Sequence, residues 1–441
     1  MNQHTPSVAQ DLPFSPDFLN RRSTAEQMTR MFSLQRDGFV VAVHAPWGDG
    51  KTYFGRNFAK MLEQEYNAMP VFIDAFEHDY VEDPFMVLAS AVYAKIKEDA
   101  KLKVKAKDFL SKAVKVGKKL LPIAAELSLK TLTCGLVSDN FAEAISTGGV
   151  KITESLLEER LTGYAEQQKS VVDFRNALAD FAKAHCARTT KRENFPKELP
   201  LIIFVDELDR CNPTFAVRML ERIKHFFEIE NVVFVLLVNN RQIFQAIRGV
   251  YGSEIDAEHY FEKFVDHSFT LGGINPHIRV KPSLMYCEKY INISQYGNNA
   301  PSKMQYIEQA YEMTSSIIDW NNEISLRDIE KIWGYVSRQY HHAVFGFGGI
   351  LAFLSTVKVK YPLEYIAFSE KDFDGMCKIV NQMLPGCPDD LYPRNILSAV
   401  IALYCDKEPT PEQIKVLRSI ASSRPSDIIP SLMSQMDCKP C

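Results

Sequence analysis

The chain has 441 residues, of which 46% are hydrophobic and 24% are charged, and its net charge at pH 7 is -4. These values are typical of a folded protein of two or three domains, and they argue against a largely disordered chain or one that is basic throughout. The nine cysteines recur at no regular spacing, which favours reduced thiols and a cytoplasmic location over a disulfide framework. The N-terminal sequence lacks the basic start and apolar run of a signal peptide.

The first predicted elements are a strand, a glycine-rich loop and a helix. Residues 38–45 (GFVVAVHA) form an apolar run, and the sequence TYFGRNFAKMLEQEY, which begins at Thr52, has the apolar spacing of a helix. The loop between them reads HAPWGDGKT. A second strand is predicted at residues 70–76 (PVFIDAF), and a helix is expected from Asp83 through Lys97.

A lysine-rich helical insertion is predicted at about residues 100–165. Lysines gather at and just before its start, at Lys95, Lys97, Lys101, Lys103, Lys105, Lys107, Lys112, Lys115, Lys118 and Lys119. Charges interrupt its apolar stretches, so no membrane span fits. Contact with an anionic membrane surface or with nucleic acid stays open, although a solvated helical surface is the more common use of such lysines.

Two further strands are predicted from continuous apolar runs at residues 201–205 (LIIFV) and 232–238 (VVFVLLV), as expected of strands buried on both faces of a parallel sheet. Asn212 and Pro213 are expected to begin the helix that follows the first of them. A further helix is expected at residues 241–250. Strands that alternate with helices predict an α/β fold with a parallel sheet of about five strands.

Helical spacing dominates the C-terminal part of the chain, from about Ile274 onward. Its longest uncharged apolar run, residues 343–357, falls short of the roughly 20 residues that cross a bilayer, so a buried helix is expected. Cys438 and Cys441 have no neighbouring Cys or His partner, which favours a disordered tail over a zinc or redox site. Arg327 is more typical of a surface residue than of a sensor arginine.

The loop APWGDGKT matches the phosphate-binding pattern [G/A]-x-x-x-x-G-K-[S/T]. In that pattern, backbone N–H groups and a helix N-terminus hold phosphates, the lysine reaches the terminal phosphates, and the hydroxyl contacts Mg²⁺. Lys51 is therefore also a catalytic candidate, Thr52 is a metal ligand, and Gly50 lets the backbone approach the phosphates. The predicted nucleotide-binding residues are Ala45, Pro46, Trp47, Gly48, Asp49, Gly50, Lys51 and Thr52.

Acidic and polar residues follow the two later strands. Asp206 is expected to hold Mg²⁺ through water, and Glu207 to polarise the attacking water; solvated acids at a capped turn are the alternative. Asn239 is a candidate to read the γ-phosphate, although Asn at a strand end often only begins a turn. Arg210 is a candidate to stabilise charge on the γ-phosphate, and pairing with acids is its alternative.

These motifs together resemble the KAP P-loop NTPases. The similar segments are HAPWGDGKT, IDAFEHD, FVDELDRCNP, VVFVLLVNN and YFEKFVDHSFTL, which span residues 38–271. Trp47 and the Asp-Arg-Cys triplet at 209–211 are the most discriminating. The chain departs from the family pattern at Ala45, Phe76 and Asn239, where the family has glycine, tryptophan and often aspartate.

The resemblance implies an ATPase that uses ATP and Mg²⁺, with an additional strand between the phosphate-loop strand and the metal strand and with a catalytic glutamate. The expected domains are a lead segment at 1–35, a KAP-like core at 36–273 and a helical domain at 274–441, which is a candidate for partner binding or self-association. The expected function is a conformational switch or motor-like regulator, linked in some members to phage defence. A nucleotide-gated scaffold with little hydrolysis and a peripheral membrane NTPase are the alternatives.

Overall fold

The structure is a computed structural model of the chain. It describes residues 12–98 without 16 and 18, 103–120, 154–186, 198–271, 286–287, 290, 301–339 without 322, 348–407, and residues 410, 411, 429 and 433. The chain divides into two compact units. The first contains Met1–Ser15, Arg22–Ala45 and Lys51–Thr270, and the second contains Pro16–Arg21, Pro46–Gly50 and Leu271–Cys441.

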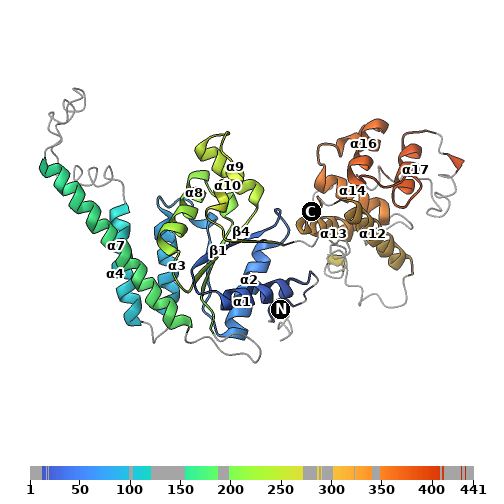
Figure 1. The fold of residues 1–441 in the computed structure, drawn as a ribbon. Helices are drawn as coiled ribbons and strands as arrows, with labels where there is room; N and C mark the ends of the chain where they lie inside the picture. The colour runs from blue at the N-terminus through green and yellow to red at the C-terminus, as the bar shows by residue number, and fades with distance from the viewer. Residues whose placement is uncertain are drawn as a thin grey trace, which may run out of the picture. The chain divides into compact units, whose positions relative to one another are not determined.

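A parallel sheet forms the centre of the first unit (Figure 1). Its strands are β1 (Phe39–His44), β2 (Val71–Asp74), β3 (Leu201–Asp206), β4 (Val232–Val238) and β5 (His267–Thr270). They lie in the order β2-β3-β4-β1-β5, and every pairing is parallel. The five-stranded parallel sheet is therefore confirmed. The additional strand between the loop strand β1 and the acidic strand β3 is β4, whereas β2 lies at the edge of the sheet.

The strands that the apolar runs predict are the buried ones. Every residue of β3 and β4 is buried, as continuous apolar sequence in a central strand requires. The sequence did not single out β5, because its four residues (HSFT) are mostly exposed and form no apolar run. Burial pattern thus accounts for both the predicted strands and the missed one.

Helices cover both faces of this sheet. They are α1 (Arg21–Leu34), α2 (Lys51–Tyr66), α3 (Pro84–Glu98), α4 (Lys103–Leu120), α7 (Glu154–Cys186), α8 (Pro213–Arg222), α9 (Asn240–Tyr251) and α10 (Ala257–Glu262). On one face, Phe58 of α2 contacts Phe204 of β3, with ring centroids 5.4 Å apart. Phe234 of β4 projects from the other face, because it lies in register with Ile203, and there it contacts Phe227 at 6.0 Å.

A polar cap fixes where α8 begins. Asn212 is the N-cap of α8 and accepts a hydrogen bond from the backbone N–H of Thr214, and Pro213 follows at the first helical position, as predicted. The apolar spacing predicts one helix through residue 227. Instead, α8 ends at Arg222 and a π-helical turn (Ile223–Phe227) follows, so that Phe227 reaches the sheet.

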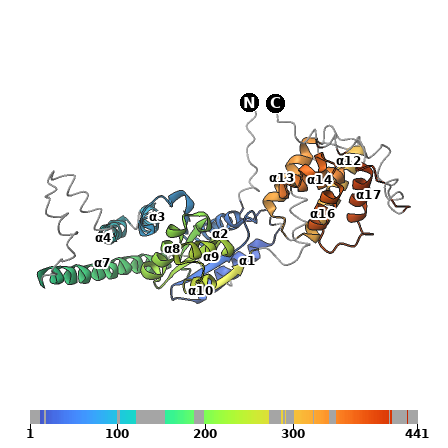
Figure 2. The same cartoon turned by 90° about the horizontal axis from the view of Figure 1, so that it is seen from above.

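The described part of the insertion is helical, as predicted. Helices α4 and α7 pack against each other and extend away from the sheet (Figure 2). Their buried faces join the core through Phe109 and Phe174, whose ring centroids are 5.3 Å apart, while Lys105 and Lys107 are exposed. In the parts of the chain that the structure describes, no helix is long and apolar enough to cross a membrane.

The second unit is helical, as predicted. Its helices are α12 (Pro301–Trp320), α13 (Leu326–Gln339), α14 (Gly348–Lys360), α15 (Ile366–Ser369), α16 (Phe373–Met383) and α17 (Arg394–Tyr404). Residues Gly348 to Val357 of α14 are all buried, which agrees with the buried helix expected there. The CxxC pair Cys438 and Cys441 lies outside the described residues. The domain boundaries at 35 and 273 stay predictions.

Candidate functional site

The glycine-rich loop joins β1 to α2. Gly48 and Gly50 have φ angles of 90° and 78°, which lie in the left-handed region that favours glycine. The loop backbone therefore requires glycine at both positions. For Gly50, this conformational reason adds to the close phosphate approach that the motif predicts.

Lys51 is the first residue of α2, and its side chain is buried. Its Nζ donates a hydrogen bond to the carbonyl oxygen of Ala45 at 2.9 Å and lies 3.9 Å from Oδ2 of Asp209. Both partners offset the cost of burying an ammonium group. The sequence singled out Lys51 and the triplet that contains Asp209, but it did not predict that the two would pair.

Asp206 ends β3 and is 1% exposed. Its Oδ1 accepts a hydrogen bond from the backbone N–H of Glu207 at 2.9 Å, and the Thr52 side chain also hydrogen-bonds to this carboxylate. Burial is the largest cause that raises the pKa of Asp206, to about 6; the negative charges of Glu207 and Asp74 add to this rise, while the two hydrogen bonds lower the pKa.

The residues around Asp206 fit a magnesium ion. Oδ2 of Asp206 is buried and has no hydrogen-bond partner in the described part of the chain. The Thr52 hydroxyl lies beside the same carboxylate, so two oxygen donors of the kind that Mg²⁺ prefers come together. Among the described residues, no group of three or more His, Cys, Asp and Glu side chains could hold a metal. Mg²⁺ usually keeps several waters and is bound by one or two carboxylates together with phosphate oxygens.

Glu207 is held in a strained backbone conformation directly after β3. Its φ is 58°, in the left-handed region that costs roughly 1 kcal/mol or more for a residue with a Cβ. Its Oε2 forms an ion pair with Nη1 of Arg210 at 2.8 Å, so the Glu207 carboxylate is turned toward Arg210. Arg210 therefore pairs with an acidic side chain, which is the alternative to its predicted role at the γ-phosphate.

Asn239 directly follows β4, at the same edge of the sheet. Its Oδ1 accepts a hydrogen bond from the backbone N–H of Arg241 at 3.2 Å, so Asn239 is the N-cap of α9. The neighbouring N–H of Asn240 donates to Nδ1 of His44, a contact that no pattern in the sequence predicts. The geometry supports the turn-starting role of Asn239, and its sensor role stays a prediction.

A carboxylate that the sequence did not single out, Asp74, lies at the end of β2. Its position in the sheet is in register with Asp206. Its Oδ1 accepts backbone hydrogen bonds from Phe76 at 3.1 Å and Glu77 at 3.3 Å. The available signal was its place directly after an apolar run, the same signal that identified Asp206.

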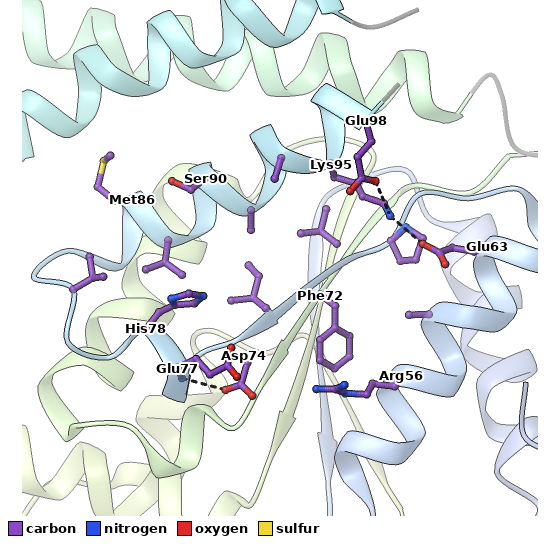
Figure 3. Close-up of a pocket in the computed structure, with 18 of the residues that line it drawn as sticks. Arg56, Glu63, Phe72, Asp74, Glu77, His78, Met86, Ser90, Lys95 and Glu98 are labelled. Atoms are coloured by element: carbon purple, nitrogen blue, oxygen red, sulfur yellow. Dashed lines mark hydrogen bonds and ion pairs between the residues drawn. The ribbon is translucent and has the colours of Figure 1, made fainter. Parts of the chain in front are cut away.

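A groove of about 900 Å³ runs along β2 between α2 and α3 (Figure 3). Asp74 and Arg56 lie at one end of it. At the other end, Lys95 forms ion pairs with Glu63 at 3.0 Å and with Glu98 at 3.3 Å. The groove therefore begins at the carboxyl edge of β2, beside the acidic residues of β3.

Comparison with known proteins gives one family. A family model described as the KAP family P-loop domain matches residues 21–333. None of the curated proteins compared with the chain matches it. Among solved structures, the ORC2 protein of Aeropyrum pernix, solved as ADPNP and ADP complexes, is 11% identical with a TM-score of 0.37, over 97% of this chain and 94% of that one. A likeness this distant carries no conclusion about the function of the chain.

Proposed function

The chain belongs to the KAP family of P-loop NTPases, whose fold binds nucleotides, and from that premise we propose that it binds ATP with Mg²⁺, hydrolyses it and acts as a nucleotide-dependent switch. One observation carries the proposal. The buried carboxylate of Asp206, with Oδ2 lacking a hydrogen-bond partner in the described chain, lies beside Thr52 at the start of α2.

Phosphate binding is the part assigned to the loop and to the start of α2. Backbone N–H groups from Ala45 to Thr52 and the positive end of the helix dipole attract the phosphates. Lys51 exchanges its contacts with the Ala45 carbonyl and Asp209 for the terminal phosphates. Because these contacts already hold the amine beside the loop, the exchange requires only a local movement of the side chain.

Metal binding and water activation are the parts assigned to the carboxyl end of β3. Thr52 and Asp206 would hold Mg²⁺, and the bound ion would neutralise charge that develops on the transferred phosphoryl group. Glu207 accepts a proton from the attacking water. To do so it must release Arg210, whose guanidinium then stabilises negative charge nearby, and Asn239 is the proposed γ-phosphate contact on β4.

Replacement of Lys51 tests nucleotide binding. Lys51→Ala should weaken ATP affinity at least 10-fold in a calorimetric titration with Mg²⁺, because it removes the charge that faces the phosphates, and should remove turnover. Lys60→Ala is the matched control, since Lys60 lies nine residues further along α2 and outside the loop. Equal ATP affinity in wild type and Lys51→Ala would refute the site.

The biological role proposed is a regulator in phage defence, and it rests on family resemblance. The same two variants test it in a bacterial host by plaque counts. Lys51→Ala should restore plaques to the level of cells that lack the protein, and Lys60→Ala should protect like wild type. Equal counts for wild type and Lys51→Ala across a broad phage panel would remove the support for this role.

A further inference from the structure

Strand register places a second carboxylate beside Asp206. Asp74 of β2 and Asp206 of β3 are in-register partners on adjacent parallel strands, which lie about 4.8 Å apart. In-register residues project from the same face of a sheet. Two residues earlier, the partners Phe72 and Phe204 stack with ring centroids 5.8 Å apart. Asp74 and Asp206 thus continue one cross-strand row on one face.

That face is the one that α2 covers. Phe58 of α2 contacts Phe204, and the Arg56 guanidinium lies 5.6 Å from the centre of the Phe72 ring. Thr52 lies one turn before Arg56 on the same side of α2 and hydrogen-bonds to Asp206. The first two turns of α2 therefore cover both strands. Asp74, the register partner of Asp206, lines the same groove as Arg56 (Figure 3).

Backbone hydrogen bonds hold the Asp74 carboxylate in place. Its Oδ1 accepts from the N–H groups of Phe76 and Glu77, at the start of the 3-10 turn Phe76–His78. A role confined to this turn would need only an acceptor oxygen. The turn therefore does not require the negative charge of Asp74. That charge adds to the rise in the pKa of Asp206 that burial causes.

A separate observation points to a cation at this edge. Oδ2 of Asp206, in a side chain that is 1% exposed, has no hydrogen-bond partner in the described part of the chain. A buried carboxylate oxygen in this state requires a donor or a positive charge. We propose that Asp74 is a positioning residue of the magnesium site. Its carboxylate would hold the ion indirectly, through water, while Asp206 and Thr52 would hold the ion as well. This inference rests on the proposed function.

The test uses Mn²⁺ in place of Mg²⁺ and measures its binding to the full-length protein with ADP by electron paramagnetic resonance. Asp74→Asn keeps the acceptor oxygen for Phe76 and Glu77 but removes the charge. It should weaken Mn²⁺ binding about 10-fold, the scale of losses at residues that support metal ligands. ADP affinity in EDTA and the unfolding temperature should stay at wild-type values.

Asp79→Asn is the matched control. The Asp79 carboxylate accepts a hydrogen bond from the backbone N–H of Asn212 at 3.0 Å. Burial raises the pKa of the Cys211 thiol, and the negative charges of Asp79 and Asp74 both add to this rise, so the two carboxylates lie in the same acidic surroundings. Mn²⁺ affinity should be unchanged in Asp79→Asn. Wild-type Mn²⁺ affinity in Asp74→Asn, or an equal loss in both variants, would overturn the role of Asp74 and leave the proposed function standing. Failure of the wild type to bind ADP with Mn²⁺ would overturn the proposed function, and the inference with it.

Discussion

At the scale of single residues, burial of the charged Asp206 carboxylate lowers the stability of the metal-free fold. The pKa of Asp206 is raised from 3.8 to about 6. Below about pH 3 the group is largely protonated in both the folded and the unfolded chain. Between about pH 4 and 6 the folded state keeps the proton and the unfolded state loses it, so the stability that Asp206 contributes falls as pH rises through this window.

Asp206→Asn should therefore stabilise the metal-free protein at neutral pH. A pKa difference of this size corresponds to about 3 kcal/mol, so in EDTA at pH 7.5 the variant should gain up to about that amount in its free energy of unfolding. At about pH 3 the two proteins should unfold alike. Denaturant titrations at both pH values measure this. A variant less stable than wild type at pH 7.5 in EDTA would contradict the assignment of buried charge.

The motif residues could be predicted from the sequence, but their partners could not. Lys51, Thr52 and Asp206 follow from a linear pattern and from the end of an apolar strand. The pairing of Lys51 with Asp209 and the register of Asp74 with Asp206 depend on which strands are neighbours. That order follows from long-range packing, which apolar spacing does not encode.

At the scale of elements, close packing of α2 on the sheet positions Thr52 over β3. Gly55 is buried in this helix, and a Cβ there would overlap Cδ1 of Leu237 and lie 3.2 Å from Cε2 of Phe72. Leu237 is fully buried on β4, so it has little room to move. The absence of a side chain at Gly55 therefore sets how near α2 lies to β2 and β4.

Gly55→Ala should lower the free energy of unfolding by about 1–3 kcal/mol, the usual cost of overpacking a core, although alanine favours a helix. Gly249→Ala is the control, since Gly249 also lies in a helix of the first unit and its Cβ would meet Pro213 no nearer than 3.7 Å. The control should be neutral or more stable by up to about 1 kcal/mol. Urea titrations compare the two, and a Gly55→Ala variant as stable as Gly249→Ala would refute the packing argument.

Elements were predictable where one physical signal dominates. The apolar run of β4 matches its strand residue for residue, and Asn212 caps α8 as its side chain predicts. Two elements were not predicted. Helix α1 lies in the N-terminal lead segment, for which no helix was expected, and the π-helical turn after Arg222 interrupts a helix that apolar spacing predicts as continuous. Helix α1 and the π-helical turn both pack a phenylalanine against a strand of the sheet. Such contacts depend on the folded sheet, so local sequence spacing does not predict them.

At the scale of the whole molecule, the side chains proposed to bind the metal, contact the terminal phosphates and activate water belong to the first unit. These are Lys51, Thr52, Asp206 and Glu207. The helical second unit has its own core, in which α14 packs between α12 and α13. Binding of a protein partner or of a second copy through the second unit, and contact of the lysine-rich insertion with an anionic surface, stay predictions from the sequence.

The most direct measurement is phosphate release in a single turnover, with excess protein, Mg²⁺ and γ-labelled ATP. Wild type should release labelled phosphate, and Glu207→Gln should bind ATP equally well but release phosphate at least about 100-fold more slowly, because it loses the base that activates water. Equal rates in the two proteins, or no release above the Glu207→Gln level in wild type, would contradict hydrolysis and favour a nucleotide-gated scaffold.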